Sequence, residues 1–143
     1  MKNILTDAIL SIKPIYTNQI LGGSKKVEFR KRKFKKSVDR VYIYSSSPQK
    51  MIVGYFTIQQ IVEDTPANLW EQFHAVGGID KDSFFEYFKD TTIGYSIVIN
   101  QVVQFDKEKD PIEFIENFSA PQSYIYLDRK SKIDLTNKKY AKI

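Results

Sequence analysis

The sequence contains no cysteine, and this absence removes several kinds of chemistry at once. Disulfide bridges, thiolate metal sites and a cysteine nucleophile are all excluded. Histidine is almost as scarce, because His74 is the only one in the 143 residues. A single imidazole cannot build a histidine-rich metal site, and it cannot form a Ser-His-Asp triad without help from other groups. We therefore expect neither a metal site nor a cofactor.

Long hydrophobic segments are missing as well. No stretch approaches the roughly eighteen consecutive apolar residues that a membrane-spanning helix needs. The opening segment, residues 1–7, lacks the apolar region of a signal peptide. These absences predict a cytoplasmic protein that does not contact a membrane.

The residues that are present predict an ordered globular protein. Hydrophobic residues make up 42% of the chain and aromatic residues 14%, enough to form a core that offsets the loss of chain entropy. The length favours one domain over residues 1–143. We expect its core within about residues 8–127 and a basic tail over residues 128–143.

Positive charge is concentrated in one place. The net charge is +5, yet residues 25–36 contain eight basic side chains and a single acid, Glu28. Residues 37–127 contain six basic and thirteen acidic side chains, so the rest of the body is mildly acidic. A localised basic strip is typical of a site for a polyanion. A solvated edge strand protected by lysines has the same composition, so both interpretations stay open.

The pattern of apolar residues predicts a mainly β fold. Alternating or β-branched runs predict six strands, at residues 8–13, 26–32, 39–45, 51–62, 91–104 and 123–127. Proline starts, polar caps and glycine pairs predict short helices at 14–21, from 66 to the glycine pair at 77–78, at 81–88 and at about 110–118. Residues 107–110 are expected to form a polar turn, and Gly54 to mark a bulge.

Few of these segments have the length of a β-α-β crossover. We therefore predict an α+β fold that is mainly β, a small mixed or antiparallel barrel of about six strands with short helices inserted.

Four residues near the start of the chain, Lys13, Lys25, Glu28 and Arg30, form the first candidate site. Lys13 ends the first expected strand and Lys25 begins the second, so both can face one cleft. Glu28 and Arg30 are two residues apart on a strand and therefore share a face. A carboxylate among cations stays ionised and can accept a base N–H, while Lys25, Arg30 and Arg32 would hold phosphate. A ladder of surface salt bridges has the same spacing.

Aromatic and hydroxyl groups form a second set of candidates. Tyr44 and Tyr95 each lie beside turn-like polar residues and would stack on an unpaired base. Ser45 offers a hydroxyl to a phosphate. Tyrosines that fill a barrel and serines that form an ordinary turn give the same pattern. Residues 33–36 are predicted to be a solvated loop that attracts polyanions without choosing among them.

Two segments resemble a known family. The sequence Leu10-Ser-Ile-Lys-Pro14, followed by Ile20-Leu-Gly-Gly-Ser-Lys-Lys-Val-Glu-Phe-Arg30, resembles the signature of the ASCH (activating-signal-cointegrator homology) domain. Asp39-Arg-Val-Tyr-Ile-Tyr-Ser45 and Pro121-Gln-Ser-Tyr124 are further matches in the same order. The resemblance implies a PUA-like β-barrel that binds RNA or modified nucleic acid in a cleft beside its first helix.

The resemblance also implies an enzymatic activity. Some similar proteins hydrolyse N4-acetylcytidine with a Lys, a Thr and a Glu. Lys25 matches the Lys position, Glu28 stands where the Thr is expected, and Glu86 is the candidate for the Glu. The departure at position 28 favours binding over catalysis. Three hypotheses follow: a module that binds RNA or another nucleic acid or nucleotide, with a regulatory role; an amidohydrolase of an N4-acylated cytidine nucleoside; and a protein-interaction domain.

Overall fold

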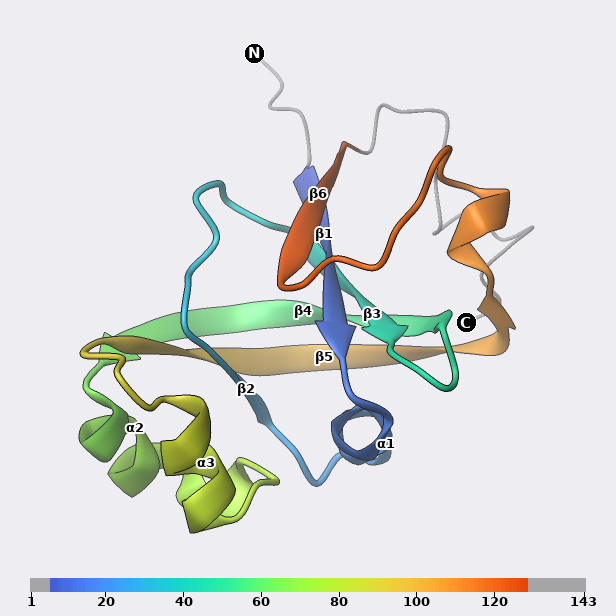
Figure 1. Ribbon diagram of the computed structural model, residues 1–143. Coiled ribbons are helices and arrows are strands. Elements are labelled where there is room, and N and C mark those ends of the chain that lie inside the picture. The colour runs from blue at the N-terminus through green and yellow to red at the C-terminus, as the bar shows by residue number, and fades with distance from the viewer. Residues whose placement is uncertain (1–5, 129–143) are drawn as a thin grey trace.

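The computed structural model describes residues 6–128, so all but the first residue of the predicted basic tail lies outside the described residues. Its centre is one curled, six-stranded sheet (Figure 1). The strands are β1 (Thr6–Ile12), β2 (Val27–Arg30), β3 (Arg40–Ser45), β4 (Met51–Asp64), β5 (Gly94–Lys109) and β6 (Tyr124–Asp128). Their order is β2-β5-β4-β3-β1-β6, and of these pairs only β1 with β3 is parallel. The predicted mixed, barrel-like fold is confirmed as a curled half-barrel.

Short helices are inserted between the strands, as predicted. They are α1 (Pro14–Gly22), α2 (Pro66–Phe73) and α3 (Lys81–Tyr87), with short 3-10 turns at η1 (His74–Val76) and η2 (Pro111–Glu113). The expected caps are present. Gly23 ends α1 with a φ of 90°, which is the left-handed conformation that glycine adopts without strain. The side chains of Thr65 and Asp80 accept backbone N–H groups at the starts of α2 and α3.

Three parts of the predicted secondary structure were wrong. Helix α2 ends at Phe73 and a 3-10 turn covers the residues before Gly77, so the glycine pair does not end the α-helix. The predicted polar turn at residues 107–110 is instead the end of β5, which runs through Lys109 opposite Ile52 of β4. The register shifts after Gln104, which lies opposite Gly54, and pairing with β4 resumes at Lys109. The predicted final helix is only the short 3-10 turn η2.

Three apolar clusters bury the two faces of the sheet. One lies inside the half-barrel and includes Leu10, Ile43 and Ile97. A second, rich in tyrosine and phenylalanine, covers the opposite face of β3 and β4. The third fills the space between β2 and the pair α2–α3, where Phe29 packs edge-on against Phe84 with ring centroids 4.8 Å apart. This third cluster fixes α3 beside β2, and residues of both elements line the candidate site.

The two edge strands of the sheet, β2 and β6, are not paired with each other. A side chain bridges the gap between them, because the Arg30 guanidinium on β2 donates to the carbonyl of Ser123 just before β6 at 3.3 Å. We call this gap the seam of the half-barrel. The candidate functional site lies beside it, where β2 passes between α1 and α3 (Figure 1).

Candidate functional site

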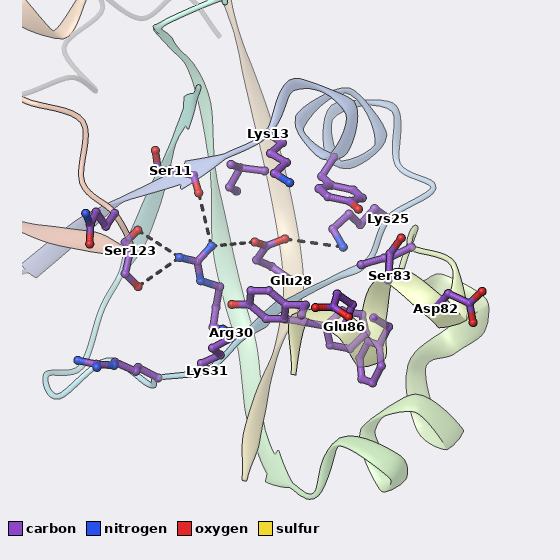
Figure 2. A pocket seen from close by; sticks show the side chains of 18 residues that line it. Ser11, Lys13, Lys25, Glu28, Arg30, Lys31, Asp82, Ser83, Glu86 and Ser123 are labelled. Carbon is purple, nitrogen blue, oxygen red and sulfur yellow. Dashed lines mark hydrogen bonds and ion pairs between the residues drawn. The ribbon is translucent and has the colours of Figure 1, made fainter. Parts of the chain in front are cut away.

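A pocket of about 1000 Å³ opens between α1, β2, α3 and the residues that precede β6 (Figure 2). Its walls carry both charged and aromatic groups. The cationic lining residues are Lys13, Lys25, Arg30, Lys31 and Arg32. The acidic ones are Glu28, Asp82 and Glu86. Five cations against three carboxylates make the pocket positive overall, and Tyr16 and Tyr87 add aromatic surface.

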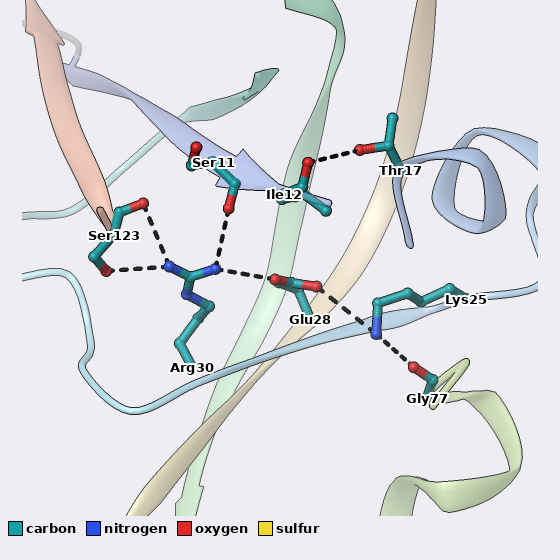
Figure 3. Close-up of polar contacts among 8 residues, drawn as sticks. All are labelled: Ser11, Ile12, Thr17, Lys25, Glu28, Arg30, Gly77 and Ser123. Carbon is teal, nitrogen blue, oxygen red and sulfur yellow. Dashed lines mark hydrogen bonds and ion pairs between the residues drawn. The ribbon is translucent and has the colours of Figure 1, made fainter. Parts of the chain in front are cut away.

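A continuous chain of polar contacts crosses the floor of this pocket (Figure 3). The Nη2 of Arg30 donates to the hydroxyl of Ser123 at 3.2 Å, and its Nη1 donates to a carboxylate oxygen of Glu28 at 3.2 Å. The other carboxylate oxygen of Glu28 lies 3.7 Å from the Lys25 amine, which in turn donates to the carbonyl of Gly77. Arg30 also donates to the carbonyl of Ser11 at 3.4 Å. Glu28 is therefore held between two cations.

The floor is largely closed to water. Lys25 is 3% exposed and Glu28 is 6% exposed. Burial lowers the pKa of the Lys25 amine, and the nearby Glu28 carboxylate offsets part of that effect. The amine also lies 5.1 Å from the centre of the Tyr16 ring and 5.2 Å from that of Phe29, contacts that favour its charged form.

Because side chains alternate along a strand, one face of β2 contacts an apolar cluster and the other contributes to the pocket floor. Val27 and Phe29 point into the cluster under α2 and α3, so Glu28 and Arg30 point to the other face. Glu28 lies opposite Ile97 of β5, which belongs to the inner core of the half-barrel. The charged pair is therefore carried at the margin of an apolar interior, which is why it is buried.

Backbone geometry supplies the last partner of Lys25. Gly78 has a φ of 67°, a conformation that side chains rarely adopt, and a Cβ there would meet the Gln19 side chain. Glycine at this position lets residues 77–78 approach α1 closely enough for the Gly77 carbonyl to reach Lys25.

The rim of the pocket is accessible, in contrast to its floor. Lys13, Lys31 and Arg32 are exposed. The Lys31 amine lies 4.9 Å above the ring of Tyr87, a half-buried residue of α3. Burial raises the pKa of the Tyr87 phenol. Glu86 on the same helix is exposed on the pocket wall. These rim residues are the ones that a ligand meets first.

The structure brings together most of the residues singled out in the sequence. Lys13, Lys25, Glu28, Arg30 and Arg32 all line this one pocket, and Glu86 joins them.

Three other candidates lie outside the residues that line the pocket. Tyr44 is 5% exposed and packs against Phe118, while Ser45 is fully buried. Both belong to β3, which is enclosed between β1 and β4. Tyr95 is half-buried and lies opposite Arg30 on β5.

Several lining residues were not selected from the sequence. Tyr16 lies three residues after Lys13, and that helical spacing could have indicated a shared face. Lys31 adjoins Arg30 and Arg32, which were selected. Ser123 appeared only within the family-like segment 121–124, and nothing local linked it to Arg30, because the two are 93 residues apart in the chain and only the closure of the sheet joins them.

Within residues 6–128, no group of three or more His, Cys, Asp or Glu side chains is arranged to hold a metal ion. Over the same part of the chain, each helix is too short or too polar to cross a membrane.

Comparisons with known proteins agree with this architecture. The chain is 25% identical over 130 residues to an ASCH domain-containing ribonuclease of Zymomonas mobilis. The aligned segment covers 87% of this chain and 86% of that protein. A crystal structure of ASCH from the same organism superposes with a TM-score of 0.80 at 25% identity, covering 86% of this chain and 88% of the other. A serine-to-alanine variant of that protein gives a TM-score of 0.81 at 24% identity, with 86% and 89% covered.

A second curated relative is the ATP synthase subunit alpha of Ureaplasma parvum, 26% identical over 120 residues. That match covers 83% of this chain but only 15% of the longer protein. The family comparison is more direct, since residues 10–115 match the ASCH domain, and this span includes Lys25, Glu28 and Arg30 of the pocket floor as well as α3. The chain therefore belongs to the ASCH domain family.

Proposed function

We propose that this protein binds RNA and that its pocket receives one unpaired nucleotide. The observation that carries the proposal is the buried Glu28 carboxylate, held between Lys25 and Arg30 beneath a rim of exposed cations. A pocket of this size accommodates a ligand as large as a nucleotide. The relationship to an ASCH domain-containing ribonuclease supports RNA as the polyanion.

The rim and the floor of the pocket bind different parts of the nucleotide. Lys25 and Arg30 are engaged with protein groups, so phosphate binding falls to the exposed cations Lys13, Lys31 and Arg32. Glu28 accepts N–H groups only and therefore suits the donor edge of a base rather than a phosphate. The ring of Tyr87 offers an aromatic surface beside that edge.

Substitution of the rim tests this proposal. The double variant Lys31→Gln/Arg32→Gln removes two exposed positive charges and leaves the floor intact. We expect it to bind a short single-stranded RNA at least about tenfold more weakly, with the slope of log affinity against log salt reduced by about 0.7 for each lost phosphate contact. Fluorescence anisotropy of a labelled RNA measures both quantities. The matched control is Lys50→Gln/Lys107→Gln, which changes the net charge equally at exposed positions outside the pocket. Equal affinities for the wild type and the rim variant would contradict the proposal.

A second function, hydrolysis, is favoured by the lowered pKa of Lys25. A buried amine whose pKa is lowered gives up its proton more readily than an ordinary lysine and can serve as a general base or nucleophile, with Glu28 or Glu86 as the assisting carboxylate. Two substrates are to be tested, single-stranded RNA and N4-acetylcytidine. Turnover of either by the wild type, lost in Lys25→Ala, would support hydrolysis. If Lys25→Ala and the wild type release product equally slowly, the pocket only binds.

A further inference from the structure

We propose that residues 31–36, here called the basic loop, form a second subsite that holds the RNA backbone next to the nucleotide in the pocket. This inference rests on the proposed function and extends it from a single nucleotide to a strand. The loop follows β2 directly, and it contains Lys31, Arg32, Lys33, Lys35 and Lys36 with no acidic residue.

The charges of the basic loop are available to a ligand. All five cations are exposed, whereas Phe34 between them is 9% exposed. Lys33 lies 3.9 Å from Glu63, but these side chains are 59% and 56% exposed, so water and salt screen that pair strongly. A phosphate group can therefore compete for Lys33.

The basic loop is anchored to the sheet and is not simply the solvated segment that its composition predicts. The Phe34 ring packs edge-on against Tyr124 of β6, with centroids 4.7 Å apart. The Tyr126 hydroxyl accepts the backbone N–H groups of Lys35 at 2.7 Å and Lys36 at 3.0 Å. These contacts fix the backbone positions from which the lysine side chains extend. The loop therefore loses less conformational entropy when an RNA strand binds.

The basic loop continues from the pocket without a break. Lys31 and Arg32 line the rim, and the following residues run along β6, as the contacts to Tyr124 and Tyr126 show. Figure 1 shows the segment after β2 rising away from α3 toward the start of β1, where the backbone N–H of Asp39 donates to the carbonyl of Thr6. An RNA strand that leaves the pocket on this side would lie directly on the exposed lysines.

The triple variant Lys33→Gln/Lys35→Gln/Lys36→Gln tests the subsite without touching the pocket. Its affinity is measured by anisotropy for two labelled single-stranded RNAs, one of about twelve nucleotides and one of about three. We expect at least tenfold weaker binding of the long RNA and a salt slope reduced by about 2, from about 0.7 for each of three contacts. Affinity for the short RNA is expected to stay within about twofold of the wild type.

Two companion variants separate local from general effects. Lys50→Gln/Lys107→Gln/Lys109→Gln removes the same charge at the other end of the β4–β5 ribbon, where Lys109 pairs with Ile52, and should bind the long RNA like the wild type. Tyr126→Phe keeps every charge but removes the hydroxyl that holds two amides of the loop. It should weaken the long RNA several-fold and leave the short one unchanged.

The outcomes distinguish the subsite from the pocket. If the long RNA binds the triple variant as tightly as it binds the wild type, or if the distant control loses as much, the subsite is wrong while the pocket proposal stands. The same holds if the triple variant loses only affinity for polyglutamate, which would assign the loop to an acidic protein. If the wild type binds neither the long nor the short RNA, both proposals are wrong.

Discussion

The contact between Glu28 and Arg30 offers the sharpest test of how the site is held together. The two side chains are 9% and 12% exposed, and their charged atoms lie 3.2 Å apart. The perturbation is a cycle of three variants: Arg30→Ala, Glu28→Gln and the two combined. The aim is to measure how much of the stability due to Arg30 depends on the charge of Glu28.

The structure sets the expected magnitudes. Breaking a buried ion pair by removing one partner costs about 3–5 kcal/mol, and the surviving contact to Lys25 keeps Arg30→Ala near about 3 kcal/mol. When residue 28 is a neutral glutamine, removal of Arg30 costs only the hydrogen bonds to Ser11 and Ser123, about 1–2 kcal/mol in total. The expected coupling energy is the difference, about 1–2 kcal/mol.

Urea unfolding at neutral pH measures the four free energies of unfolding. The matched control is the same kind of cycle on Lys33 and Glu63, whose charged atoms lie 3.9 Å apart on the surface. There we expect a coupling of about 0.5 kcal/mol or less because both groups are well solvated. Additivity of the Glu28 and Arg30 substitutions, or a surface coupling as large as the buried one, would refute the view that Arg30 holds an ionised Glu28 at the seam.

Three further predictions concern the surrounding structure. Gly54→Ala should cost about 1–3 kcal/mol of unfolding free energy, because its Cβ would clash with the backbone carbonyl of Val103; thermal unfolding would detect this, and an unchanged midpoint would contradict it. Phe84→Ala should cost about 3–5 kcal/mol and also weaken RNA binding, since fully buried Phe84 fixes α3 against β2; half-buried Phe85→Ala should cost less in the same urea titrations. The pKa of Lys25 lies below its ordinary 10.5 in the folded protein, so the free energy of unfolding should rise with pH between the lowered pKa and 10.5. Urea titrations across this range should show that rise in the wild type and not in Lys25→Met. An equal rise in the variant would assign the pH dependence to other groups.

The local features of the fold were readable from the sequence. Pro14 and Gly23 bound the first helix, and Thr65 and Asp80 cap the next two, because these residues satisfy backbone groups or φ angles within a few positions in the chain. Alternation along residues 26–32 correctly placed Glu28 and Arg30 on one face of a strand. Such properties depend on nearest neighbours, so composition and spacing are enough to predict them.

Two differences between the sequence-based expectations and the structure depend on long-range pairing. Residues 107–110 are polar, yet β5 continues through Lys109 because that residue pairs with Ile52 of β4, more than 50 residues away in the chain. The sequence placed Tyr44 and Ser45 among the candidates for ligand contact, and the structure places both on β3, between β1 and β4, where their side chains are buried. Which strand becomes central is decided by the whole sheet.

The basic strip itself shows the same division. By its sequence alone, residues 25–36 concentrate charge, alternate along a strand and place one acid among cations. Only the tertiary structure sorted them into a buried floor at Lys25 and Glu28, an exposed rim and an anchored loop. It did so by bringing Gly77 and Ser123 to the ends of the polar chain, across 52 and 93 residues. Sheet closure makes those contacts, and no local pattern encodes them.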